Sequence, residues 1–203
     1  MSDLWNKARE HLRRRDVVLR PLIRAVGPCT LRPMMNLFET LVRSIVSQQI
    51  SGKAAISISK KLIEGACGGK LSAAKLLGCS EEELRSAGLS TSKRRSLLDL
   101  ADHVENRGLD LEELRELPDD EVIARLIPVR GIGRWTAQMF LIFSLGRPDV
   151  LPVDDFGLKT AVQRQYGFSD LPGRAAIEEK AQPWRPWASV ATWYLWRSLD
   201  NKA

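Results

Sequence analysis

The sequence predicts an all-α protein with two helical lobes and a cleft between them. From Leu37 onward apolar residues recur with the period of a helix, and no segment alternates apolar and polar residues over the length of a strand. Helix-start signals precede several of these segments, such as the capping box Ser80-Glu81-Glu82-Glu83. At 203 residues the chain can bury a core, as one domain or two small lobes.

The N-terminal half is predicted to alternate helices with short breaks. Residues 4–15 form a helix, and prolines and glycines up to residue 36 predict loops and short turns. The helix that starts at Leu37 closes at Gln48-Gln49-Ile50, and Ser51 can cap the next one. Further on, glycines predict a loop over residues 65–69. The sequence from Gly88 to Arg95 leads into a helix that ends at Gly108, and residues 119–127 form another.

A glycine turn follows this last helix. Pro128 cannot continue the helix because it lacks an N–H group. Gly131 and Gly133 lack the Cβ atom that would forbid left-handed backbone or block the close approach of another molecule. A second helix opens at Arg134, so the turn aims free N–H groups at one point, which suits a phosphate. By itself the turn equally suits an ordinary connection between two packed helices.

Two acidic residues, Asp154 and Asp155, precede an apolar helix that starts at Phe156. Aspartate is a favoured N-cap, so both could serve only as caps. Two aspartates also leave one for capping and one to project into the cleft. A carboxylate at a helix N-terminus is favoured in its ionised form.

Three ordered motifs resemble one known family. LIPVRGIGRWTA resembles the helix-hairpin-helix of the DNA glycosylase superfamily, and LPVDDFGLKT resembles the segment that holds the family's catalytic aspartate. With LFETLVRSIVSQQISGKAA upstream, the chain is most similar to the 3-methyladenine DNA glycosylase II family, over residues 37–200. The resemblance implies a single glycosylase unit. Its parts would be a lobe at 37–118 with a wedge loop, the hairpin and catalytic segment at 119–170, and helices at 1–36 and 171–203 that complete the second lobe. Residues 1–36 are too few for the family's N-terminal β lobe.

The resemblance also implies roles for individual residues. Asp155 would be the catalytic carboxylate, which stabilises a cationic sugar and supplies a water. Gln48 and Gln49 would form the wedge that fills the space of an extruded nucleotide. The residues expected to bind the DNA backbone are Gly131, Gly133, Arg134, Thr136 and Lys93. Backbone carbonyls of Ile127, Val129 and Ile132 would hold a monovalent cation, a phosphate bridge and not a catalyst.

The expected base pocket is aromatic. Its candidates are Trp135, Met139, Phe156 and Trp196. Aromatic residues more often belong to a core, but an indole face attracts the positive charge of an alkylated purine. Bifunctional relatives carry a lysine where Trp135 stands, so no lyase activity is expected. Several members carry an aromatic residue at Met139 and an arginine at Ala188, so the range of substrates stays open.

Composition limits the partners and cofactors that can be expected. The net charge of +6 favours a polyanionic partner. The three cysteines have no metal-ligand spacing. Related iron–sulfur glycosylases carry a four-cysteine cluster near the C-terminus, and no cysteine follows Cys79 here, so the resemblance implies no iron–sulfur cluster; no required cofactor is expected. No run is long enough to span a membrane. We expect a monomer, in the cytoplasm with the nucleoid if prokaryotic and in the nucleus if eukaryotic.

The sequence therefore predicts a monofunctional DNA N-glycosylase. It would flip alkylated purines, such as 3-methyladenine and 7-methylguanine, out of duplex DNA that contains damaged bases, excise them and leave an abasic site in base excision repair. Two alternatives remain open. One is a glycosylase for deaminated or mismatched bases such as hypoxanthine or uracil, and the other is a non-catalytic helix-hairpin-helix DNA-binding protein.

Overall fold

The chain folds into helices and turns, as the computed structural model shows for residues 2–34 and 36–200. No β-strand occurs within these ranges, which confirms the all-α class. The helices form two compact units. We call Met1–Pro33 with Leu141–Ala203 the terminal unit, and Met34–Phe140 the central unit. Among the described residues no helix is both long and apolar enough to cross a bilayer.

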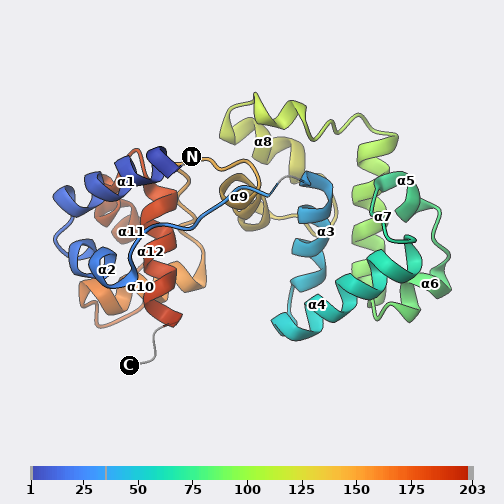
Figure 1. The fold of residues 1–203 in the computed structure, drawn as a ribbon, viewed down its shortest axis with the longest axis horizontal. Coiled ribbons are helices and arrows are strands. Elements are labelled where there is room, and N and C mark those ends of the chain that lie inside the picture. The colour runs from blue at the N-terminus through green and yellow to red at the C-terminus, as the bar shows by residue number, and fades with distance from the viewer. Residues whose placement is uncertain (1, 35, 201–203) are drawn as a thin grey trace. The chain divides into compact units, whose positions relative to one another are not determined.

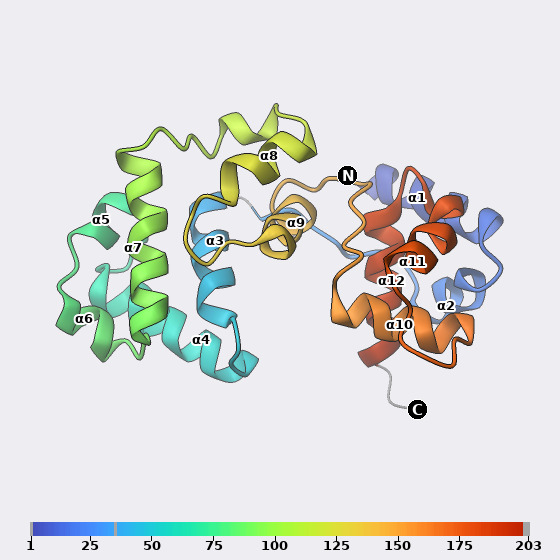
Figure 2. The same ribbon diagram turned by 180° about the vertical axis from the view of Figure 1, so that it is seen from behind.

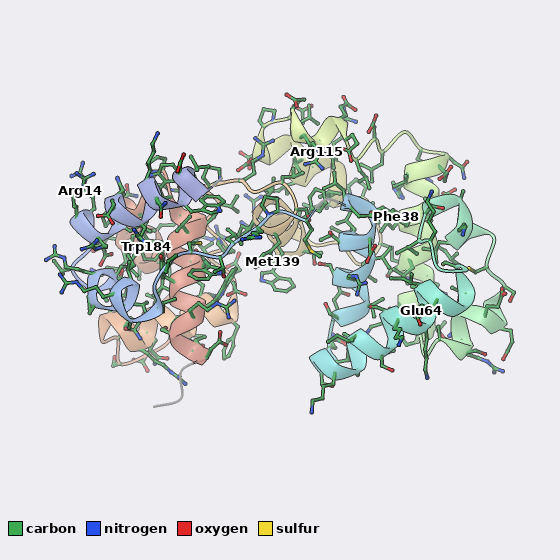
Figure 3. The ribbon with its side chains drawn as sticks, in the orientation of Figure 1. Arg14, Phe38, Glu64, Arg115, Met139 and Trp184 are labelled. Atoms are coloured by element: carbon green, nitrogen blue, oxygen red, sulfur yellow. The ribbon has the colours of Figure 1, made fainter. Side chains whose placement is uncertain are left out.

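The terminal unit is built around its last helix. Its elements are α1 (Ser2–Arg15), α2 (Leu19–Val26), α10 (Phe156–Tyr166), α11 (Arg174–Lys180), the 3-10 helix η3 (Gln182–Trp184) and α12 (Ala188–Asp200). Helix α12 packs against α1, α2 and α10 (Figure 1). Trp184 of η3 is fully buried and lies where η3 packs against α1 (Figure 3). Both ends of the chain therefore contribute to this core.

Helix α2 corrects the loop expected after residue 15. Pro21 lies in the first turn of α2, where the missing N–H group would have no partner within the helix anyway. The side chain of Asp16 precedes this turn and accepts the N–H groups of Val18 at 2.8 Å and Leu19 at 3.0 Å. Proline thus starts a helix here, although it was interpreted as a break.

The central unit surrounds one long helix. Its elements are α3 (Leu37–Ser47), α4 (Gly52–Lys61), the π-helix η1 (Leu62–Ala66), α5 (Ala73–Leu77), α6 (Glu81–Ser86), α7 (Thr91–Glu105), the 3-10 helix η2 (Glu113–Arg115), α8 (Asp119–Leu126) and the start of α9 (Arg134–Phe143). Helix α7 packs against α3, α5 and α6 (Figure 2). The predicted caps are confirmed, because Ser51 accepts the N–H of Ala54 and Ser80 with Glu83 forms the capping box.

Two further boundaries differ from the sequence prediction. The loop expected at 65–69 starts inside η1, which continues α4 through Ala66. The short helix α5 was not predicted, since five residues are too few to show a helical period. The compact units divide residues 119–170 after Phe140, within α9, and the predicted segment bounds stay a prediction. The cleft expected between the lobes stays a prediction.

Candidate active site

Asp155 is the N-cap of α10. Its backbone N–H donates to the carbonyl of Pro152 at 2.9 Å, and its Oδ1 accepts the N–H of Leu158 at 2.6 Å. The residue is 9% exposed. The carboxylate thus satisfies one of the free N–H groups at this helix end. It is fixed at the start of α10, with most of its area covered.

One aspartate was expected to cap the helix and the other to project into the cleft, and this assignment of roles was wrong. Asp155 itself caps the helix, whereas Asp154 forms ion pairs. Oδ2 of Asp154 lies 2.6 Å from Nη2 of Arg174, and Oδ1 lies 4.0 Å from Nζ of Lys159. Asp154 points toward α11 because its ion-pair partner Arg174 lies there. The sequence does not reveal a pairing between residues 20 positions apart. One acid is thus left at the cap.

A tryptophan from α12 reaches the same oxygen. The indole Nε1 of Trp196 donates to Oδ1 of Asp155 at 2.8 Å. Its ring stacks on Phe143 with 5.7 Å between centroids and 18° between planes. A Cβ atom on Gly157 would lie 3.1 Å from Oδ1 of Asp155 and 3.2 Å from Cδ1 of Trp196. Sequence analysis placed Trp196 in the base pocket and missed Phe143 and Gly157. The only local signal was a glycine in the first turn of a helix.

The segment that leads to Asp155 is attached to α12 at a second place. The Ser189 hydroxyl donates to the carbonyl of Arg147 at 2.7 Å and accepts the N–H of Val150 at 2.9 Å. The Asp149 carboxylate accepts the N–H of Ala188 at 3.0 Å, at the start of the helix. Ala188 itself is fully buried. Ser189 and Trp196 are two helical turns apart, so α12 holds the loop and its acid along one face.

The predicted glycine turn lies in the central unit between α8 and α9. Gly131 has a φ of +81°, and a Cβ there would lie 2.7 Å from Oγ of Ser96 in α7. The carboxylate of Asp99, also in α7, accepts the N–H of Arg130 at 2.7 Å. At Gly133 neither a positive φ nor a nearby side chain requires glycine. Its backbone is ordinary, and a Cβ would meet nothing within 4 Å. Gly131 is therefore required by the fold, and Gly133 leaves open space beside the turn.

The residues predicted to bind the DNA backbone differ in exposure. Arg134 is exposed, and its guanidinium lies 3.7 Å from Asp120. Thr136 is only 4% exposed, so it offers little surface to a phosphate. The ammonium of Lys93 donates to the carbonyl of Val46, and burial lowers the pKa of this lysine. These roles stay predictions.

The two wedge candidates have different environments. The amide of Gln48 donates to the carbonyl of Gly131 at 2.9 Å and so ties the α3–α4 loop to the hairpin. Gln49 is exposed and has a φ of +58°, which is uncommon for a residue other than glycine. Strain of this kind concentrates at functional sites. Gln49 is thus the exposed residue of the pair, and its role as a wedge stays a prediction.

The remaining pocket candidates belong to both units. On α9, Trp135 is 46% exposed and Met139 (Figure 3) is buried. In the terminal unit Phe156 is 72% exposed at the start of α10. The structure thus joins Trp196 directly to Asp155. It places Trp135 and Met139 one turn apart on their own helix.

The three cysteines, all in the described part of the chain, are free thiols. Sγ of Cys67 lies 3.9 Å from Sγ of Cys79. Burial raises the pKa of Cys29 to about 11, and burial with the neighbouring Cys79 raises that of Cys67 to about 12. Within residues 2–34 and 36–200 no three His, Cys, Asp or Glu side chains are grouped so that they could hold a metal ion.

Known proteins share this arrangement of motifs. Residues 42–186 match the family described as HhH-GPD superfamily base excision DNA repair protein. The alkylbase DNA glycosidase-like protein mag2 of Schizosaccharomyces pombe is 30% identical over 198 residues, which cover 95% of this chain and 93% of the relative.

Two solved structures are also similar. The 3-methyladenine DNA glycosylase (Mag1) of the same yeast, in complex with abasic DNA, has a TM-score of 0.84 and 31% identity, over 97% of this chain and 98% of that one. A DNA-3-methyladenine glycosidase from Bacillus halodurans has a TM-score of 0.84 and 38% identity, over 93% and 87%. The chain belongs to the HhH-GPD superfamily of base excision DNA repair proteins.

Proposed function

We propose that this protein is a monofunctional DNA glycosylase that hydrolyses the N-glycosidic bond of alkylated purines and leaves an abasic site. The observation that carries the proposal is the Asp155 carboxylate, which is held at a helix N-terminus by N–H donors from α10 and α12. Relatives named as 3-methyladenine glycosylases, one of them solved with abasic DNA, support this substrate class.

The chemistry needs one anion. As the glycosidic bond breaks, the sugar acquires oxocarbenium character, and a nearby carboxylate stabilises that charge and orients the attacking water. The N–H donors of Leu158 and Trp196 hold the Asp155 carboxylate in place for this role. An alkylated purine already carries a positive charge and leaves without being protonated, so the reaction needs no general acid.

DNA binding uses the central unit. N–H groups around Gly131 and Gly133, with the exposed Arg134, would bind backbone phosphates without reading sequence. Gln49 would enter the duplex and replace the flipped nucleotide, a step that costs a few kcal/mol and favours weakly paired bases. The net charge of +6 adds general attraction to double-stranded DNA.

A monovalent cation fits the hairpin chemically. The carbonyls of Ile127, Val129 and Ile132 are neutral oxygen ligands, and Val129 O already accepts the N–H of Ile132 at 3.0 Å. A cation would use that oxygen's second lone pair and link the turn to a phosphate. Hydrolysis itself requires no cofactor. The proposal includes a monomer without lyase activity, because Trp135 has no amine to form a Schiff base.

The test compares two neighbouring acids. Asparagine at 155 can still accept both N–H groups, so Asp155→Asn removes the charge and retains the cap. We expect release of 3-methyladenine and 7-methylguanine from methylated DNA by the wild type, and a rate at least about 100-fold lower for Asp155→Asn. The matched control, Asp154→Asn, loses only the ion pairs with Arg174 and Lys159 and should keep the wild-type rate.

Other results of these assays would identify one of the alternative functions. Release of hypoxanthine or uracil without any methylated base would identify a glycosylase for deaminated bases. DNA binding that Asp155→Asn leaves unchanged, with no base released, would identify a non-catalytic binder. Trapping of a covalent adduct by borohydride would contradict the monofunctional assignment.

A further inference from the structure

We propose that Trp196 is a positioning residue for Asp155, and that Gly157 provides the space this requires. The inference rests on the proposed function for its meaning in catalysis, but the contact itself can be measured separately. It assigns the indole N–H of Trp196 to the carboxylate, in place of the contact with the flipped base expected from the sequence.

The geometry at Oδ1 is the first support. This oxygen accepts one N–H from its own helix, Leu158 at 2.6 Å, and one from α12, Trp196 at 2.8 Å. A second donor from a different helix restrains rotation of the carboxylate about its Cβ–Cγ bond, and with it the direction of both oxygens. Hydrogen bonds to an ionised group are strong enough for this purpose.

The donor is itself held in place. Phe143 stacks on the Trp196 ring in a nearly parallel orientation, with 18° between the ring planes. Two turns earlier, Ser189 bonds the same helix to Arg147 and Val150, in the loop that ends at Asp155. Acid and indole are therefore attached to one rigid frame. Movement of one relative to the other would break contacts at two places.

Gly157 explains how the indole reaches the acid. Its backbone lies outside the left-handed region, so glycine is not required there by φ. Instead, a Cβ would lie 3.1 Å from Oδ1 of Asp155 and 3.2 and 3.3 Å from the Cδ1 and Nε1 atoms of Trp196. Such contacts would force the indole and the carboxylate a few tenths of an ångström apart. The glycine is needed for close approach of two side chains.

Two substitutions separate positioning from stacking. Trp196→Phe keeps an aromatic ring beside Phe143 but removes the N–H donor. Gly157→Ala keeps every functional group and lengthens the contact. We expect either change to slow single-turnover excision of 7-methylguanine by about tenfold to a hundredfold, the usual weight of a hydrogen bond to a charged group.

The proposal also predicts the behaviour of the double variant, the affinity for DNA and the behaviour of a control variant. The double variant should be little worse than either single variant, since both act on one contact. Affinity for abasic DNA should stay at the wild-type level. Trp193→Phe is the matched control on the same helix, because the Trp193 ring packs on Tyr194 and Arg197. It should keep the wild-type rate, and thermal unfolding of all variants confirms that they fold.

A spectroscopic readout makes the inference independent of activity. The NMR cross-peak of the Trp196 indole N–H, assigned by its absence in Trp196→Phe, should lie downfield in the wild type and move upfield in Gly157→Ala. A cross-peak that Gly157→Ala leaves in place would overturn the inference, as would a wild-type excision rate in Trp196→Phe. If the wild type releases no methylated base while the cross-peak moves as expected, the proposed function fails and the positioning contact stands.

Discussion

Substitution of Gly131 by alanine should destabilise the protein through two separate effects. A non-glycine residue in the left-handed region, here at φ +81°, costs about 1–2 kcal/mol. The new Cβ would lie 2.7 Å from Oγ and 3.1 Å from Cβ of Ser96, which is 5% exposed and has little room to move. Overpacking of this kind costs about 1–3 kcal/mol. The expected loss in the free energy of unfolding is therefore about 2–5 kcal/mol.

The assay is urea unfolding followed by circular dichroism, with Gly133→Ala as the control in the same turn. A Cβ at Gly133 meets nothing within 4 Å, so this variant should unfold within about 0.5 kcal/mol of the wild type. Its affinity for DNA should still fall, if the open space at Gly133 receives a phosphate. The two glycines would then be separated experimentally, one needed for folding and the other for binding.

A second substitution tests the steric part. Ser96→Ala removes the Oγ atom at 2.7 Å, so Gly131→Ala should cost about 1 kcal/mol less in that background. Equal costs in both backgrounds would show that the clash with α7 is not the cause. A Gly131→Ala protein as stable as the wild type would refute the reasoning altogether, because both the strain and the contact would then be relieved by movement of the turn.

Two further predictions concern stability. Asp16→Ala removes the acceptor of the Tyr166 hydroxyl at 2.6 Å and of the buried Trp184 indole at 2.8 Å. Urea unfolding should show that the free energy of unfolding falls by about 3 kcal/mol or more. A fall of less than about 1 kcal/mol would contradict the contribution of this hydrogen-bond network. Because burial raises the pKa of Cys29 to about 11 and that of Cys67 to about 12 from 9.0, the unfolded chain loses thiol protons above pH 9 that the folded chain keeps. The free energy of unfolding should therefore fall between pH 9 and pH 11, by up to about 1.4 kcal/mol per pH unit for each thiol. Cys67→Ala should make this decline shallower, and an unchanged slope would argue against the shift.

Some elements could not be predicted because their signals are too short or ambiguous. Pro21 breaks a helix in most positions but is tolerated in a first turn, and the sequence does not say where the first turn of α2 lies. Helix α5, Ala73–Leu77, is too short to show a period. Asp154 and Asp155 are chemically identical neighbours, so only the position of Arg174 shows which one is neutralised in an ion pair.

The sequence by itself determined the all-α class, the turn at Gly131, the serine caps and the position of Asp155 at the start of a helix. These features depend on residues within about one helical turn of each other, and local preference is enough to predict them. Tertiary structure alone decided that Trp196 donates to Asp155, 41 residues away, and that Gln48 donates to Gly131, 83 residues away. An indole or an amide can bond many partners, and only the packing of distant helices selects the one it meets.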